Sequence, residues 1–242
     1  MRNFLVLESN FGPFIINRHD RLQGPALLLS GRPHIQGELD KILGLVARLP
    51  PEAIVVDAGA NAGLVSVPIA QLLAPKAGRV LAFEVQRMMY YALCGTVALN
   101  GLENLFVYHL GLGDSLREAA IAPPDYGVLQ DFGTFSLLEQ GGANPSEQVS
   151  IVTIDSLELP RLDFLKIDVE GMDIEVLRGG ANTIRTHRPW CWVEYWKVGA
   201  PQVKGAFNAE GYEFFVMDDL NLLCAPRERI AEVGINIDAP RV

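Results

Sequence analysis

The chain has 242 residues, of which 49% are hydrophobic, and a formal net charge of −9 at pH 7. This length fits one α/β domain with a substantial core. No apolar run reaches the roughly 20 residues of a membrane helix, and the run at residues 4–7 is too short for a signal peptide. The negative charge argues against a long contact with nucleic-acid phosphates. We therefore expect a cytoplasmic protein with no membrane span and no nucleic-acid partner.

The N-terminal region predicts a small extension before the main domain. Two short apolar runs flank the turn Asn10-Phe11-Gly12-Pro13 and predict a hairpin. Residues 38–49 then carry apolar side chains at helical spacing, and Pro50-Pro51 ends this helix. We assign residues 1–36 to the extension and residues 37–242 to one domain.

Residues 53–67 join a buried strand to a helix through a glycine turn. The strand is a short apolar run that ends in Asp57, which suits a parallel sheet buried on both faces. Two glycines permit a tight bend and let a ligand approach the backbone closely. We therefore predict that this loop binds a cofactor, through the residues Asp57, Gly59, Ala60, Asn61 and Gly63.

The residues of this loop favour one cofactor over another. A dinucleotide fingerprint, G-x-G-x-x-G, would need glycine at the positions of Asn61 and Leu64. Asp57 would repel a pyrophosphate but attract the ammonium group of S-adenosylmethionine (SAM). Glu84 ends the next apolar run, roughly 20 residues past the loop, where a carboxylate can accept both hydrogens of a ribose diol. We predict that SAM binds here, with Val85 also in its site. The alternative is that Asp57 and Glu84 only cap the following helices.

Strands and helices continue to alternate after the loop, which is typical of a doubly wound sheet. In chain order, we expect a helix at 64–73, a strand at 79–83, a helix at 88–99 and a strand at 105–109. The loop that follows reaches the same sheet edge if these strands are parallel. There Gly113 would cover an adenine ring and Asp114 would take its amino group, although Asp114 is equally suited to a turn.

Residues 115–148 form an irregular stretch that is rich in proline and glycine. Long, turn-rich excursions at a ligand edge often carry specificity. We predict that this one covers the methyl acceptor and not the cofactor. Phe132 and Phe135 would form an apolar wall, or would instead anchor the segment to the core.

Residues 164–171 place three charges on a mainly apolar strand. By strand alternation Lys166, Asp168 and Glu170 share one side. A fourth strand lies beside the first in a doubly wound sheet, so Asp168 would reach the cofactor, and both carboxylates could position and deprotonate an acceptor. Lys166 would keep a neighbouring carboxylate ionised. Alternatively, Lys166 forms a structural pair and Asp168 a helix cap. If neither carboxylate acts, the next candidates are His109, His187 and Glu194.

Two motifs, Asp57-Ala-Gly-Ala-Asn-Ala-Gly63 and Lys166-Ile-Asp-Val-Glu-Gly171, resemble those of the FkbM family of SAM-dependent methyltransferases. The resemblance runs from about residue 51 to residue 211. It implies a Rossmann-like class I methyltransferase fold, with a mostly parallel, doubly wound seven-stranded sheet and a C-terminal antiparallel hairpin. It also implies O-methylation of a hydroxyl on a small molecule or glycan, with cofactor contacts at Asp57, Gly59, Asn61, Gly63 and Glu84. Val85, where the family often has proline, and Met172-Asp173, where it often has Ala-Glu, depart from the pattern.

Three other functions are weighed against O-methylation. N-methyltransferases of DNA carry an Asn/Asp-Pro-Pro-aromatic motif at the end of the fourth strand, where this chain has residues 168–171. A nicotinamide-dependent oxidoreductase is disfavoured by the loop, and a catalytically silent SAM-binding protein remains an alternative. The 3 cysteines and 4 histidines show no metal-ligand spacing, so we expect no structural zinc site and assign no metal ligand; whether a divalent metal is needed stays open.

Overall fold

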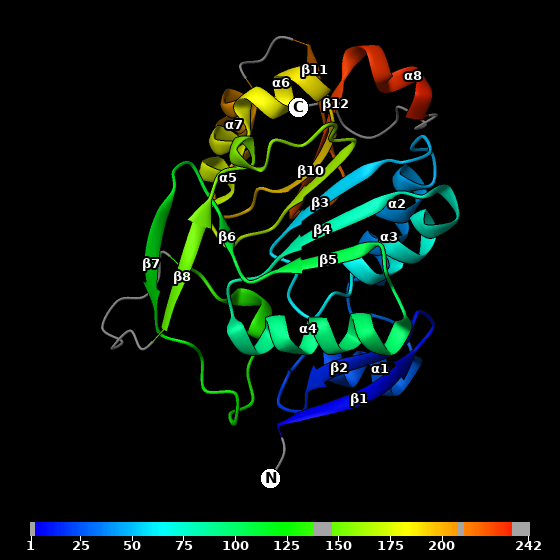
Figure 1. The fold of residues 1–242 in the computed structure, drawn as a ribbon, viewed down its shortest axis with the longest axis vertical. Helices are drawn as coiled ribbons and strands as arrows, with labels where there is room; N and C mark the ends of the chain where they lie inside the picture. Colours follow the sequence, from blue (N-terminus) through cyan, green and yellow to red (C-terminus); the bar gives the residue numbers. More distant parts are fainter. Residues whose placement is uncertain (1–2, 138–146, 208–210, 234–242) are drawn as a thin grey trace.

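The computed structural model describes residues 3–137, 147–207 and 211–233 of the chain. Its centre is a seven-stranded sheet (Figure 1). In spatial order the strands are β11 (Tyr212–Val216), β12 (Asn221–Pro226), β10 (Trp190–Glu194), β9 (Phe164–Ile167), β3 (Ile54–Ala58), β4 (Arg79–Phe83) and β5 (Leu105–Tyr108). Strand β12 runs antiparallel to both neighbours, whereas the four pairings from β10 to β5 are parallel. The predicted doubly wound sheet with its antiparallel C-terminal hairpin is thus confirmed.

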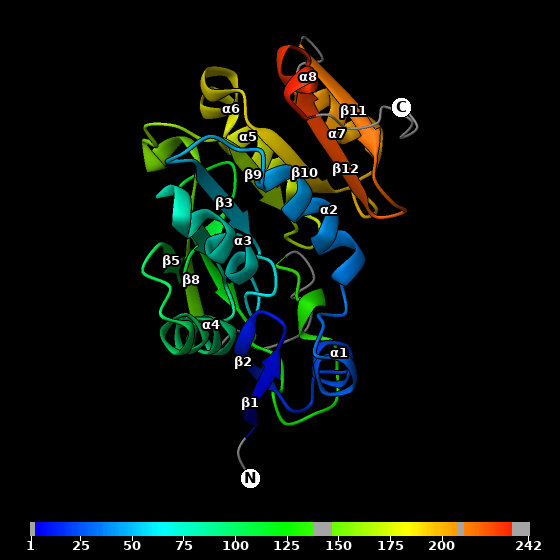
Figure 2. The same ribbon diagram turned by 90° about the vertical axis from the view of Figure 1, so that its right-hand side faces the viewer.

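Helices cover both faces of this sheet (Figures 1 and 2). They are α2 (Gln36–Val46), α3 (Ser66–Leu73) and α4 (Arg87–Asn100) on one face, and α5 (Asp173–Gly179), α6 (Ala181–His187) and α7 (Ala200–Ala206) on the other. The apolar run of β3 explains why two layers form, because successive side chains point to opposite faces. Val55 packs into the core on the first face, and its neighbour Val56 packs into the core on the second. A strand buried on both faces was predicted from this run.

The N-terminal residues form the hairpin of β1 (Phe4–Ser9) and β2 (Gly12–Asn17). Helix α1 (Gln23–Ser30), which was not predicted, follows it. The hairpin is fastened to α4: the N–H of Ile15 donates to Thr96 Oγ1 at 2.9 Å, and Asn100 Nδ2 donates to the carbonyl of Pro13 at 2.7 Å. The extension is therefore held against the sheet domain by polar contacts as well as by packing.

A second sheet involves the stretch expected to be irregular, residues 115–148. Its strands are, in spatial order, β6 (Gly111–Leu112), β8 (Glu147–Val152) and β7 (Arg117–Ile121), of which β7 and the first two residues of β8 are part of that stretch. Strand β8 pairs parallel to β6 and antiparallel to β7. The prediction missed β7 because that strand mixes charged residues with alanine and shows little apolar alternation. The short helix η2 (Phe132–Thr134) lies between β7 and β8, and residues 138–146 fall outside the described part of the chain.

The remaining short elements are η1 (Ala74–Lys76), η3 (Asp155–Leu157), η4 (Arg227–Arg229) and α8 (Ile230–Val233). Two of the cysteines, Cys191 and Cys224, are free thiols that lie opposite each other on β10 and β12, although they are far apart in the sequence. Among the described helices, none combines the length and apolar character that a membrane crossing requires.

Candidate active site

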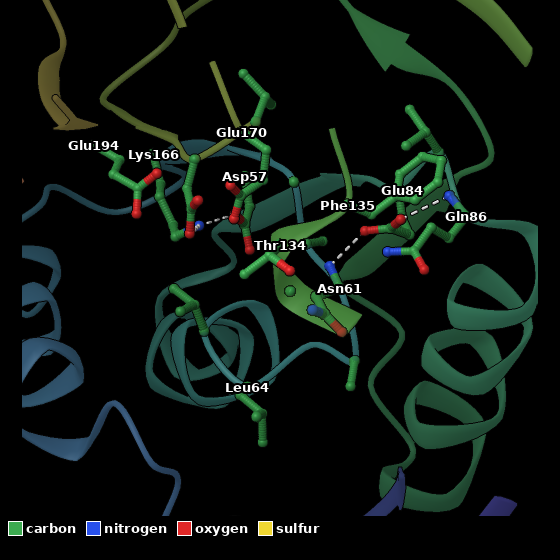
Figure 3. Close-up of a pocket in the computed structure, with 18 of the residues that line it drawn as sticks. Asp57, Asn61, Leu64, Glu84, Gln86, Thr134, Phe135, Lys166, Glu170 and Glu194 are labelled. Atoms are coloured by element: carbon green, nitrogen blue, oxygen red, sulfur yellow. Dashed lines mark hydrogen bonds and ion pairs between the residues drawn. The ribbon is translucent and has the colours of Figure 1, made fainter. Parts of the chain in front are cut away.

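A cavity of about 390 Å³ lies at the carboxyl ends of β3, β4, β9 and β10. The order of the strands in the sheet reverses at this point: the chain adds β4 on one side of β3 and later adds β9 on its other side. Ligands of open α/β sheets bind at such a switch point. The two ends of the cavity differ in character: Asn61, Glu84 and Gln86 lie at one end, and Asp57, Lys166, Glu170 and Glu194 at the other (Figure 3).

The glycine loop (residues 57–63) follows β3 and is held close to β9. Gly59 has φ +82°, and a Cβ atom there would lie 1.9 Å from the carbonyl oxygen of Asp168. Both the conformation and the space therefore require glycine. The N–H groups of Gly59 and Ala60 donate to the carbonyl of Phe83 at 3.0 and 2.9 Å, which ties the loop to β4.

Gly63 has a different role from the one predicted. It does not line the cavity. It has φ +85°, and a Cβ atom there would lie 2.3 Å from Leu93 Cδ1 on α4. This glycine therefore allows the end of the loop and the helix after it to pack closely against α4.

Glu84 lies in the cavity and is almost fully buried, with 4% of its surface exposed. Its two carboxylate oxygens accept the N–H of Asn61 and the N–H of Gln86, each at 2.7 Å (Figure 3). Burial raises the pKa of Glu84 to about 7, and these two hydrogen bonds oppose that rise. Each oxygen has a second lone pair available to a ligand. The backbone thus fixes a carboxylate that can still accept two hydrogen bonds.

Gln86 was missed by the sequence analysis. Its side chain is buried beside Glu84, and its Nε2 donates to the carbonyl of Phe132 at 2.8 Å. It therefore connects the end of the cavity that contains Glu84 to η2. The apolar strand before it gives no signal for this contact, because the partner lies 46 residues further along the chain.

Lys166 is buried at the other end of the cavity, with 4% of its side chain exposed. Its Nζ lies 3.4 Å from Asp57 Oδ1 and 3.2 Å from Asp168 Oδ2. Burial alone would lower the pKa of Lys166, but the charges of Asp168, Asp57 and Glu38 raise it above its ordinary value. Lys166 is therefore held as a cation. This confirms that it pairs with a neighbouring carboxylate.

Asp57 is fully buried, and its second oxygen accepts a hydrogen bond from Ser66 Oγ at 2.5 Å. The prediction from the sequence was that Asp57 attracts the ammonium group of SAM. In the structure its charge is already shared with Lys166. Its position is set by contacts inside the protein, so it also holds the start of the glycine loop in place.

Three carboxylates, from Asp168, Glu170 and Glu194, form an acidic cluster at this end of the cavity. Each offers an oxygen within 4.8 Å of the others. Glu170 Oε2 is paired with Lys197 Nζ at 2.5 Å, and its backbone has φ +57°. Such a spacing can accommodate a cation, but Lys166 and Lys197 already bring positive charge to two of the three groups. We assign no metal ligand among them.

Glu194 differs from the other two members of the acidic cluster. Its Oε2 is buried and has no hydrogen-bond partner in the part of the chain that the structure describes. Burial, and then the charges of Asp168, Glu170 and Asp173, raise the pKa of Glu194 to about 9, while Lys166 lowers it. The cavity thus contains one carboxyl group that holds a proton more tightly than its neighbours.

The loop after β5, which was predicted to contact adenine, lines the cavity with residues one or two positions earlier than predicted. Gly111 and Leu112 line the cavity together with Val85, but Gly113 and Asp114 do not. Gly113 packs against α5 instead, where a Cβ atom at Gly179 would lie 1.8 Å from the carbonyl oxygen of Gly113. The side chain of Asp114 is exposed and bonded to Ser115 Oγ. Gly113 donates its backbone N–H to the carbonyl of Val152 at 2.9 Å, next to the pairing of β6 with β8, and the residues predicted to contact adenine, Gly113 and Asp114, lie outside the cavity lining.

The two aromatic residues of the segment around η2 lie in different surroundings. Phe135 lines the cavity, whereas Phe132 is buried against Tyr126, with ring centroids 5.4 Å apart. The segment also contacts the glycine loop, because a Cβ atom at Gly133 would lie 3.4 Å from Asn61 Nδ2. The structure therefore does not separate this excursion from the predicted cofactor residues.

Two histidines named as alternatives lie outside the cavity. The Nε2 atoms of His109 and His187 hydrogen-bond to the carbonyl oxygens of Val85 and Leu159, at 3.0 and 3.1 Å. Another part of the cavity wall was not predicted from the sequence. It comes from the N-terminal region and from the loops after β10 and β11. These residues are Leu22, Gln23, His34, Ile35, Glu38, Trp196 and Leu220.

Comparison with known proteins identifies the chain's relatives. Residues 57–213, more than half of the chain, match the model of the methyltransferase FkbM domain. Methyltransferase sdnD of Sordaria araneosa is 25% identical over 221 residues, covering 76% of this chain and 85% of that protein. The AMB antimetabolite synthetase AmbE of Pseudomonas aeruginosa is 31% identical over 170 residues, covering 54% of this chain and 8% of that protein.

A solved structure shows the same fold. The methyltransferase FkbM from Methylobacillus flagellatus KT superposes with a TM-score of 0.53 and 16% identity, over 79% of this chain. The aligned part is 51% of that protein, so this chain spans about half of its length. The matched family range contains both the glycine loop and the charged end of β9. These two features of the cavity, together with the family match and the shared fold, place the chain in the FkbM methyltransferase family.

Proposed function

We propose that this methyltransferase uses SAM to methylate a hydroxyl group of a small molecule or glycan. The observation that carries the proposal is the buried carboxylate of Glu84, which backbone N–H groups of Asn61 and Gln86 hold in the cavity. Its two remaining lone pairs suit the two hydroxyls of a ribose. Gly59 keeps the loop free of side-chain bulk beside Asp168, at the end of β9.

The residues of the cavity fit the parts of SAM. Glu84 and Asn61 would hold the ribose, and Val85, Gly111, Leu112 and Phe135 offer apolar surface for the adenine. The amino-acid part of SAM would then lie toward Asp57 and Lys166, where carboxylate and ammonium groups are both present. SAM supplies an electrophilic methyl group on a sulfonium ion.

The acidic cluster is placed to act on the acceptor. A displacement at carbon requires the acceptor oxygen to be positioned in line and to lose its proton as the new bond forms. Asp168, paired with Lys166, and Glu170, paired with Lys197, can accept hydrogen bonds from an acceptor hydroxyl. We propose that these two carboxylates orient it.

Three rival functions are tested directly. Titration with SAM and with NAD separates a methyltransferase from a nicotinamide-dependent enzyme. Transfer of a labelled methyl group from SAM to a panel of hexoses, phenols and primary amines then separates O-methylation, N-methylation and a silent SAM-binding protein. We expect SAM to bind, NAD not to bind, and label to appear on hydroxyl compounds only. Label on amines alone would contradict the assignment to oxygen.

Replacing Glu84 with alanine should weaken SAM binding by about tenfold to a hundredfold, because charge-assisted hydrogen bonds are worth about 1.5 to 3 kcal/mol. The dissociation constant is measured by calorimetry on the folded variant. Asp114→Ala is the matched control: it removes a carboxylate that lies outside the cavity, so affinity should not change. An unchanged affinity in Glu84→Ala would overturn the assignment of the ribose site.

A further inference from the structure

Glu194 ends β10 and faces the acidic cluster from a different strand. Val193 pairs with Ile167 in the parallel register of β10 and β9, so the next residues, Glu194 and Asp168, leave their strands side by side. Glu194 also lines the cavity. In Figure 3 its side chain lies beside Lys166 at the charged end. A group that is placed in this way can reach the same acceptor atom as Asp168.

The three carboxylates of the acidic cluster do not have the same partners. Asp168 has the ammonium group of Lys166 at 3.2 Å, and Glu170 has that of Lys197 at 2.5 Å. In the described ranges, Glu194 has neither a lysine within ion-pair distance nor a hydrogen bond to its buried Oε2. A cationic partner stabilises the ionised form and makes a carboxylate a weaker base. The basicity within the cluster is therefore concentrated on Glu194.

We infer that Glu194 is the catalytic base, which takes the proton of the acceptor hydroxyl while Asp168 and Glu170 orient that hydroxyl. The inference rests on the proposed SAM-dependent O-methylation. In the transfer step the acceptor oxygen forms a bond to the methyl carbon, and the bond between that carbon and sulfur breaks, with its electron pair remaining on sulfur. The O–H bond breaks as well, and its proton moves to Oε2 of Glu194, which becomes a neutral carboxylic acid.

The charges around Glu194 predict how its protonation changes with pH. It faces Asp168 and Glu170 after β9, Asp173 on α5, and Lys166 on β9. Burial and the three acidic neighbours raise its pKa to about 9, so the free protein near pH 8 contains mostly the protonated form. A sulfonium ion bound in the same cavity would favour the ionised form. Binding of SAM should therefore release a proton from Glu194, and affinity should increase as the pH rises toward 9.

The inference is tested by calorimetry of SAM binding at pH 8 in two buffers that differ in ionisation enthalpy. We expect the native protein to release about half a proton or more per bound SAM. Glu194→Gln, which has the same shape and cannot ionise, should release much less. Asp114→Asn, outside the cavity, should behave like the native protein. An equal proton release from Glu194→Gln and from the native protein would overturn the inference.

Single-turnover transfer to the best acceptor of the hexose and phenol panel provides a second readout. Glu194→Gln should be about a hundredfold slower or more at pH 8 and should lose the rise of rate with pH. Glu194→Asp keeps a carboxylate and should retain that rise at a lower rate. A retained rise in Glu194→Gln would defeat the inference while leaving the proposed function intact. Failure of the native protein to bind SAM would defeat the proposed function itself.

Discussion

Asp168→Asn or Glu170→Gln, at saturating SAM, is expected to slow single-turnover methyl transfer by about a hundredfold or more. Both carboxylates lie in the cavity, and both belong to the acidic cluster that faces the predicted acceptor. Each substitution removes a negatively charged oxygen that would accept a hydrogen bond from the acceptor hydroxyl. This hydrogen bond would stabilise the transition state of methyl transfer more than it stabilises bound SAM. The affinity for SAM, measured separately, should therefore change little.

Glu118→Gln is the matched control for this experiment. Glu118 is exposed on β7, accepts a hydrogen bond from Ser150 and is not part of the cavity lining. Its loss should leave the rate of transfer unchanged. Near-normal rates in both Asp168→Asn and Glu170→Gln would contradict the orienting role. Since His109 and His187 lie outside the cavity, Glu194 would then be the carboxylate of the acidic cluster left to contact the acceptor hydroxyl.

The sequence predicts the central sheet because its signals are local. A buried parallel strand appears as a continuous apolar run, as in β3, and the turn after it needs glycine within a few residues. Glu84 also follows directly from its strand, and the structure places it in the cavity. These features depend on neighbours in the chain, so they could be found without knowledge of the fold.

The rest of the site depends on contacts that are distant in sequence. Gly113 bonds to Val152 next to the pairing of β6 with β8, and Phe132 is held by Gln86 across 46 residues. The pairing of Glu170 with Lys197 brings two loops together. Cavity-lining residues from the N-terminal region, such as Ile35, belong to no sequence motif that would indicate a site. Apolar or charged residue types alone do not indicate which of these pairs will meet.

The buried ion pair of Lys166 gives the largest effect that we expect on stability. Lys166→Met should lower the free energy of unfolding by about 3 to 5 kcal/mol, because it leaves the carboxylate of Asp57 buried without its cationic partner. Ser66 would then be the hydrogen-bond donor that remains to that carboxylate. Urea denaturation at pH 7 measures the loss.

A control and a double substitution decide whether the buried charge is the cause. Lys41 pairs with Asp218 on the surface, with 40% and 32% of the two side chains exposed, so Lys41→Met should cost about 1 kcal/mol or less. Asp57→Asn combined with Lys166→Met removes both charges and should recover part of the stability that Lys166→Met loses. A loss in Lys166→Met no larger than that in Lys41→Met would show that the charge on Asp57 is not confined in the interior. Additive losses in the double substitution would lead to the same conclusion, because two groups that interact across 3.4 Å must be coupled.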